Sequence, residues 1–224
     1  MYNFYIHIGN FKTGSTSLQS FLYLNRKIFL KKNIEILYEK KSFIKDAPQN
    51  EKMFKYINNL NEIKIKNFLT KLNKKKNYIM SSEYFSTLTG DTNKLKFLKD
   101  IIIKSGFKPI IIFYYRNDKT YLYSFYRELL KHKKIIRIDT VFNFLKKIEK
   151  YGYYSNIKNN YYFFSQNYYF DNQRIFYEWT KIFKKNFYKF EYDKKKENKI
   201  YLDFLKLFNN IEFKDLQLPK NKNV

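Results

Sequence analysis

Short apolar runs, rich in β-branched and aromatic residues, alternate along this chain with segments of helical periodicity. The clearest runs cover residues 2–8, 78–81 and 107–115. Each has the length of one buried strand, and each is followed by polar residues and then by apolar residues spaced as on one face of a helix. Strands that alternate with helices predict an α/β fold, with a central parallel sheet flanked by helices in three layers.

The rest of the sequence contains further segments that are typical of strands and helices. We expect further strands at residues 34–38 and 187–192, and helices at residues 18–29, 51–75 (two lysine-rich helices), 95–105, 119–131, 141–150, 174–184 and 200–209. No linker or internal repeat interrupts the 224 residues, so we expect a single domain over 1–224. Ligands of parallel sheets bind at the carboxyl ends of the strands, so the chemistry should follow Ile8, Ser81 and Tyr115.

The composition narrows the possible sites and partners. The chain has no cysteine and two histidines, so we expect neither a disulfide nor a metal site. Its formal charge is +25, but only five of its 45 basic residues are arginine. We interpret the charge as solvated lysines with a modest preference for anionic ligands, and predict no nucleic-acid partner. The longest apolar run, at 110–115, is too short to span a membrane, and no signal peptide precedes the first strand, so we expect a cytoplasmic protein.

A glycine- and hydroxyl-rich loop lies between the first strand and the first helix. Its glycines let backbone N–H groups turn inward, the helix N-terminus adds partial positive charge, and Lys12 adds a full charge. It differs from an ATP-type P-loop because its lysine precedes the second glycine. We therefore predict a phosphate-binding loop made of Gly9, Lys12, Thr13, Gly14, Ser15, Thr16 and Ser17.

A second anion-binding element is predicted after the strand at 107–115. Arg116 ends this strand, and Ser124 follows on the next helix. An arginine offers a forked donor suited to phosphate, and a serine hydroxyl can reach the same group. Each residue alone also has a structural explanation, a salt bridge for Arg116 and a helix surface for Ser124. Together with the loop, they would fit a nucleotide that carries two anionic groups.

Glu83 is the candidate general base. It follows the strand at 78–81 and so belongs to the same edge of the sheet as Lys12. A carboxylate partly shielded from water can take a proton from an attacking hydroxyl. Glu83 could instead cap the following turn. His7 is the rival base, although a histidine inside a strand is more often a core residue.

These motifs resemble those of the sulfotransferases that use 3'-phosphoadenosine 5'-phosphosulfate (PAPS), above all the bacterial and carbohydrate-acting branches. Residues 6–19 resemble the family's 5'-phosphosulfate loop, and the spacing of Arg116, Ser124 and Tyr126 resembles its 3'-phosphate element. The run Ser-Ser-Glu ending at Glu83 resembles the segment where glucosaminyl-type members carry a catalytic glutamate. A weaker resemblance extends over residues 177–205. The chain ends where relatives usually continue, so the domain is expected to be short at its C-terminus.

The resemblance implies transfer of a sulfuryl group from PAPS to a hydroxyl acceptor, with a glycan or glycolipid as the favoured acceptor class. It implies that Lys12 and Glu83 are catalytic, that adenosine 3',5'-bisphosphate is the product nucleotide, and that no metal takes part. Two other classes stay open. A P-loop nucleotide kinase or NTPase would need a magnesium-binding carboxylate, for which Glu83 is the nearest candidate, and a basic nucleic-acid-binding module would show steep salt dependence.

Overall fold

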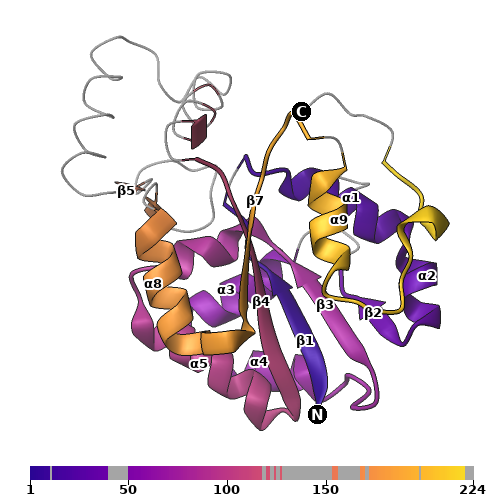
Figure 1. The fold of residues 1–224 in the computed structure, drawn as a ribbon. Coiled ribbons are helices and arrows are strands. Elements are labelled where there is room, and N and C mark those ends of the chain that lie inside the picture. The colour runs from indigo at the N-terminus through magenta and orange to yellow at the C-terminus, as the bar shows by residue number, and fades with distance from the viewer. Residues whose placement is uncertain are drawn as a thin grey trace.

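A five-stranded parallel sheet forms the centre of the molecule (Figure 1). The computed structural model describes residues 1–10, 12–39, 50–117, 120, 121, 124, 127, 153–155, 167–169, 172–196 and 198–219. The strand order is β2-β3-β1-β4-β7. The strands are β1 (Tyr2–His7), β2 (Ile34–Ile36), β3 (Asn77–Ser81), β4 (Phe107–Tyr115) and β7 (Phe187–Glu191). The predicted α/β fold with a central parallel sheet is confirmed.

Helices cover both faces of the sheet (Figure 1). One face carries α3 (Glu51–Asn58), α4 (Glu62–Leu69), α5 (Thr92–Lys104) and α8 (Asn172–Phe183). The opposite face carries α1 (Ser15–Leu24), α2 (Arg26–Lys31) and α9 (Lys199–Leu205). Short 3₁₀ turns η1 (Glu83–Leu88), η2 (Lys184–Asn186) and η3 (Phe213–Asp215) connect some of these elements. In the described parts of the chain, no helix is both long and apolar enough to cross a bilayer.

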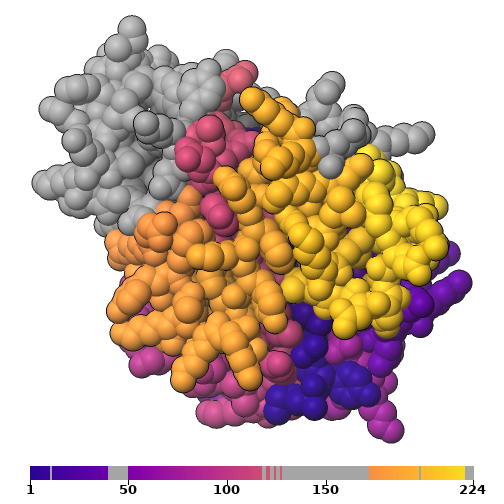
Figure 2. Space-filling view, in the orientation of Figure 1, coloured from indigo at the N-terminus to yellow at the C-terminus, as the bar shows by residue number. Residues whose placement is uncertain are grey.

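The alternation of side chains along each strand divides the interior into two cores. On β1, Phe4 and Ile6 face the core under α3, α4, α5 and α8, whereas Tyr5 faces the core under α1, α2 and α9. Both cores consist of buried apolar side chains, and Trp179 of α8 is fully buried in the first. In the same orientation, Figure 2 shows the chain from α8 onward forming much of the visible surface.

The elements differ from the sequence prediction in a few places. The helix expected over 18–29 is two helices, because Asn25 interrupts it: its side-chain amide donates to the carbonyl oxygens of Phe21 and Gln217, both at 2.8 Å. The turn expected after Glu83 is a 3₁₀ helix of six residues, η1, which was not among the predicted helices. Residues 151–173, for which the sequence pattern predicts no helix or strand, contain an antiparallel pair, β5 (Tyr153–Ser155) and β6 (Asn167–Tyr169). The helix expected over 141–150 lies outside the described residues, as does most of that over 119–131.

The sheet register brings three polar segments to one edge. β1 lies between β3 and β4, with His7 paired to both Ser81 and Ile112. Beyond β1 the chain stays beside β4, since the N–H of Asn10 donates to the carbonyl of Tyr114 at 3.2 Å. The segments after β1, β3 and β4 therefore meet at the carboxyl edge of the sheet, as the sequence predicts.

Candidate functional site

The loop after β1 folds back on itself before α1 begins. The hydroxyl of Thr13 donates to the carbonyl oxygen of Asn10 at 2.5 Å, and both side chains are buried. Lys12 and Gly14 both adopt positive φ, at 64° and 78°. Glycine tolerates this conformation, whereas for lysine it costs about 1–3 kcal/mol. Such strained residues cluster at functional sites, although Leu60 and Lys184 also adopt positive φ in this chain.

Close contacts leave no room for a side chain at either glycine of the loop. An added Cβ on Gly9 would lie 2.8 Å from His7 Nε2, 3.0 Å from Ser15 Oγ and 3.1 Å from Thr13 Oγ1. An added Cβ on Gly14 would lie 2.5 Å from the ring of Tyr192, in addition to the strain from its positive φ. The loop is thus packed closely on β1 at one glycine and on the chain after β7 at the other.

The N-terminus of α1 has no side-chain cap among the described residues. Gly14 is its N-cap residue, so no side chain caps the first-turn N–H groups. Ser15 Oγ is buried and has no hydrogen-bond partner, and Thr16 is half-buried with no hydrogen bond from its hydroxyl, within the described residues. Unpartnered donors next to a helix N-terminus favour a negatively charged ligand. Half-buried Lys12 precedes them on the same loop.

The hydroxyl of Ser17 makes a contact that the sequence did not indicate. It lies 2.5 Å from the hydroxyl of Tyr201 on α9, and Tyr201 stacks on Phe21 of α1 with ring centroids 4.5 Å apart. Ser17 is therefore oriented toward α9, and Thr13 toward the backbone of its own loop. Of the four predicted hydroxyl donors, the structure leaves those of Ser15 and Thr16 without a protein partner in its described part.

Arg116 lies directly after β4, next to the loop. Its guanidinium is 4.9 Å from the ring centroid of Tyr192, and its donors make no hydrogen bond or ion pair with the described residues. Its carbonyl oxygen accepts from the amide of Asn172 at 2.7 Å, and the carbonyl of that side chain accepts from Asn10 at 3.4 Å. Ser124 is helical and half-buried, but no hydrogen bond links it to Arg116.

Glu83 begins η1 directly after β3 and is half-buried. The preceding N–H, of Ser82, donates to the carbonyl of His7 at 3.1 Å, which fixes this segment to the end of β1. Tyr121 lies nearby: burial, together with the charge of Glu83, raises the pKa of its phenol. Tyr121 was not predicted from the sequence, because an aromatic residue on a predicted helix cannot be distinguished there from an ordinary core residue.

His7 is fully buried, as expected of a core histidine. Its Nδ1 lies 2.8 Å from Ser81 Oγ, which also accepts from Gln19 Nε2 at 3.2 Å. Its ring packs edge-on against Tyr114, with centroids 5.6 Å apart. Burial lowers the pKa of His7 to about 3, so the ring is neutral at physiological pH.

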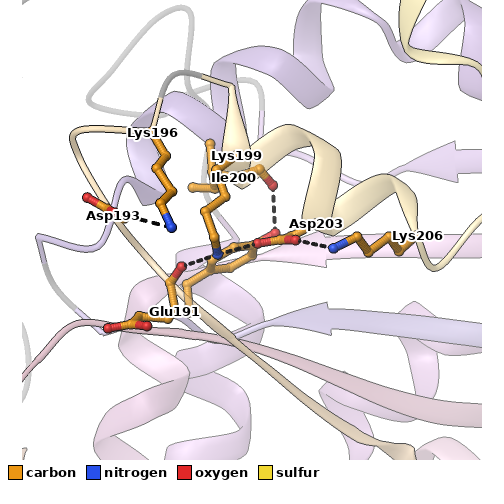
Figure 3. Close-up of polar contacts among 8 residues, drawn as sticks. Glu191, Asp193, Lys196, Lys199, Ile200, Asp203 and Lys206 are labelled. Carbon is orange, nitrogen blue, oxygen red and sulfur yellow. Dashed lines mark hydrogen bonds and ion pairs between the residues drawn. The ribbon is translucent and has the colours of Figure 1, made fainter.

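An ionic network holds α9 against the end of β7 (Figure 3). Lys199 donates to the carbonyl oxygen of Glu191 at 2.7 Å and to the carboxylate of Asp203 at 2.6 Å, and Lys206 binds the same carboxylate at 2.6 Å. Burial alone would raise the pKa of Asp203, but the hydrogen bonds from the two lysines lower it overall. The hydroxyl of Tyr114 donates to the carbonyl of Ile200 at 2.7 Å. The positions of Tyr192 and Tyr201 follow from this anchoring.

The described residues contain no group of three or more side chains suited to hold a metal ion. No family model and no curated protein matches the chain. Among solved structures it is similar to a sulfotransferase from Alicyclobacillus acidocaldarius, with a TM-score of 0.45 and 10% identity over 92% of this chain and 77% of that one. A likeness at this level of identity says nothing about activity or ligands.

Proposed function

We propose that the chain is a sulfotransferase that transfers a sulfuryl group from PAPS to a hydroxyl acceptor. The observation that carries the proposal is the position of Tyr192, whose ring contacts Gly14 of the loop and has its centroid 4.9 Å from the guanidinium carbon of Arg116. Two anion-binding elements, predicted separately from the sequence, thus lie beside the same aromatic ring. This arrangement suits a nucleotide with one anionic group at its 5' end and another at its 3' position.

The donors at the site fit PAPS. The uncapped N-terminus of α1, the unpartnered Ser15 and Thr16 hydroxyls, and Lys12 suit the 5'-phosphosulfate. Arg116 offers donors that are not engaged by the described residues, and with Ser124 it would hold the 3'-phosphate. When bound, PAPS would supply a sulfuryl group activated by its bond to a phosphate leaving group.

The residues of the chain have two tasks in the transfer. Glu83 accepts the proton of the acceptor hydroxyl as its oxygen bonds to sulfur, and Lys12 stabilises the charge that develops on the 5'-phosphate oxygen as its bond to sulfur breaks. The proton ends on Glu83, and adenosine 3',5'-bisphosphate is the leaving product. Tyr121 remains protonated beside Glu83, because its pKa is raised. No metal is needed in this scheme.

The acceptor class rests on the resemblance of the motifs to the carbohydrate-acting branch of the family, whereas the compartment rests only on the expectation from the sequence. We propose a glycan or glycolipid hydroxyl as acceptor and the cytoplasm as the compartment. No specific observation favours the kinase or the nucleic-acid-binding alternative. Glu83 lies just after β3, and the described residues contain no group of three or more side chains suited to hold a metal ion.

Nucleotide binding without magnesium tests the proposal. Adenosine 3',5'-bisphosphate at a hundredfold excess over its Kd should stabilise the fold by about 2.7 kcal/mol. For a chain of this size the melting temperature should then rise by roughly 5–11 °C, measured by thermal denaturation with EDTA present. ATP with magnesium is the comparison ligand, because a kinase would bind it. Stabilisation by ATP with magnesium alone would support the kinase reading and overturn the sulfotransferase proposal.

A further inference from the structure

We propose that Tyr192 is a positioning residue of the nucleotide site, which orients Arg116 toward the 3'-phosphate and holds the loop at Gly14. The inference rests on the proposed function and adds to it a residue that no sequence motif indicates. Tyr192 is half-buried and contacts both anion-binding elements. Its loss should therefore change which nucleotide the site prefers, and not only how stable the fold is.

The backbone of Tyr192 is fixed by the sheet. In the register of β4 and β7, Tyr115 pairs with Glu191, and the N–H of Tyr192 donates to the carbonyl of Tyr115 at 2.7 Å. Arg116 is the next residue after Tyr115, so the pairing of β4 with β7 places Tyr192 beside Arg116. On the other side, Lys199 binds the carbonyl oxygen of Glu191 at 2.7 Å, which restrains the chain just before Tyr192 (Figure 3).

The contact with Arg116 leaves the arginine competent to bind phosphate. A ring centroid 4.9 Å from the guanidinium carbon is within range of a cation–π interaction. Such an interaction uses the π-face of the tyrosine and forms no hydrogen bond, so the five N–H donors of the guanidinium stay available to a phosphate. A long side chain that is already supported also loses less conformational freedom when the ligand binds.

The contact with Gly14 connects Arg116 to the loop. The ring of Tyr192 occupies the space where a side chain at position 14 would lie, next to Ile200 of α9. The same ring therefore limits where the N-terminus of α1 and the guanidinium can lie relative to each other. A site that must bind two phosphates of one nucleotide at a set spacing requires such a restraint.

Ordinary packing is the competing explanation for Tyr192, and the ratio of two dissociation constants separates the two. The ratio is the Kd of adenosine 5'-monophosphate, which lacks the 3'-phosphate, divided by the Kd of adenosine 3',5'-bisphosphate. Each nucleotide is titrated calorimetrically without magnesium. Arg116→Ala should lower this ratio by about ten- to a hundredfold. Tyr192→Leu should lower it by about three- to tenfold, and Tyr192→Phe should keep it within about twofold, since the aromatic face is retained.

Three further variants complete the experiment. Tyr192→Met fills the space without an aromatic face and should behave as Tyr192→Leu, which covers the case in which the leucine variant does not fold. Arg116→Ala combined with Tyr192→Leu should show the ratio of Arg116→Ala alone. Tyr177→Leu is the matched control, because Tyr177 is exposed on α8 with its ring 5.8 Å from Lys181. It should leave the ratio unchanged.

The outcomes distinguish this inference from the proposed function. If Tyr192→Leu and Tyr192→Met keep the wild-type ratio while Arg116→Ala loses it, Tyr192 only packs and the inference is wrong, but the proposed function stands. If Arg116→Ala itself leaves the ratio unchanged, Arg116 does not bind the 3'-phosphate, and the proposed function fails with the inference.

Discussion

At the scale of single residues, the two candidate bases lie in opposite environments. His7 is fully buried, and burial lowers its pKa to about 3. Glu83 is half-buried at the edge of the sheet, one residue beyond Ser82. A general base works best with a pKa near the working pH and within reach of the substrate, so the geometry favours Glu83 over His7.

The buried, neutral His7 makes the stability of the fold depend on pH. The unfolded chain binds a proton at this histidine below about pH 6.5, whereas the folded chain does so only near pH 3. Stability is therefore fully present above pH 6.5 and falls as the pH drops toward 3, by up to about 1.4 kcal/mol per pH unit for one proton. Urea unfolding at several pH values gives the free energy of unfolding as a function of pH, and we expect a shallower slope in His7→Gln than in the wild type. Because the slope is taken within each protein, the overall cost of the substitution cancels. Equal slopes would mean that His7 binds a proton as readily in the folded chain as in the unfolded chain.

At the scale of elements, α9 depends on one buried carboxylate. Asp203 is 5% exposed and binds both Lys199 and Lys206, and the first of these lysines also binds the end of β7 (Figure 3). A helix of seven residues is too short to be stable by itself. The two ion pairs of Asp203 are local, at i,i+4 and i,i+3, so α9 is placed by the bond from Lys199 to β7 and by the burial of Ile200 and Phe204. Tyr192, which contacts Gly14, and Tyr201, which contacts Ser17, are held in place by the attachment of α9 to β7.

Removing the charge of Asp203 should therefore cost more than removing an exposed partner. Asp203→Asn should lower the free energy of unfolding by about 1–3 kcal/mol, because charge-assisted hydrogen bonds are lost near a buried site. Lys206→Ala, whose side chain is 69% exposed, should cost less than about 1 kcal/mol. Since the folded pKa of Asp203 is lowered, its contribution is present above pH 4 and is lost as the pH falls through that folded pKa. Denaturant unfolding at neutral pH measures the loss of unfolding free energy in each variant. Equal losses in Asp203→Asn and Lys206→Ala would contradict the prediction.

At the scale of the whole molecule, local patterns were sufficient for the fold. Apolar runs such as residues 107–115 are recognised as buried strands by their short length and their β-branched and aromatic residues. Parallel pairing then places the segments after them at one edge of the sheet. The loop from Gly9 to Ser17 could be predicted because its chemistry lies in consecutive residues. The break at Asn25 could not, since it depends on a hydrogen bond to Gln217, far along the chain.

The roles of single side chains were less predictable, because they depend on distant contacts. Tyr192 and Tyr201 are two of 23 tyrosines, and only the folded chain brings them to Gly14 and Ser17. The orientation of the Ser17 hydroxyl toward α9 likewise needs a partner 184 residues away. Motif reading therefore finds the candidate donors, and the tertiary structure decides which of them face a ligand.

Transfer of the sulfuryl group itself tests the central claim most directly. Purified protein would be incubated with PAPS and a panel of glycans and glycolipids, and both sulfated product and adenosine 3',5'-bisphosphate would be measured by mass spectrometry. We expect the two products in equal amounts with at least one acceptor, and a rate about 10² to 10⁴ lower in Glu83→Gln, with nucleotide binding and melting temperature unchanged. Near wild-type turnover in Glu83→Gln would contradict the role of Glu83. A folded, nucleotide-binding protein that transfers nothing from PAPS to any acceptor of the panel would contradict the central claim.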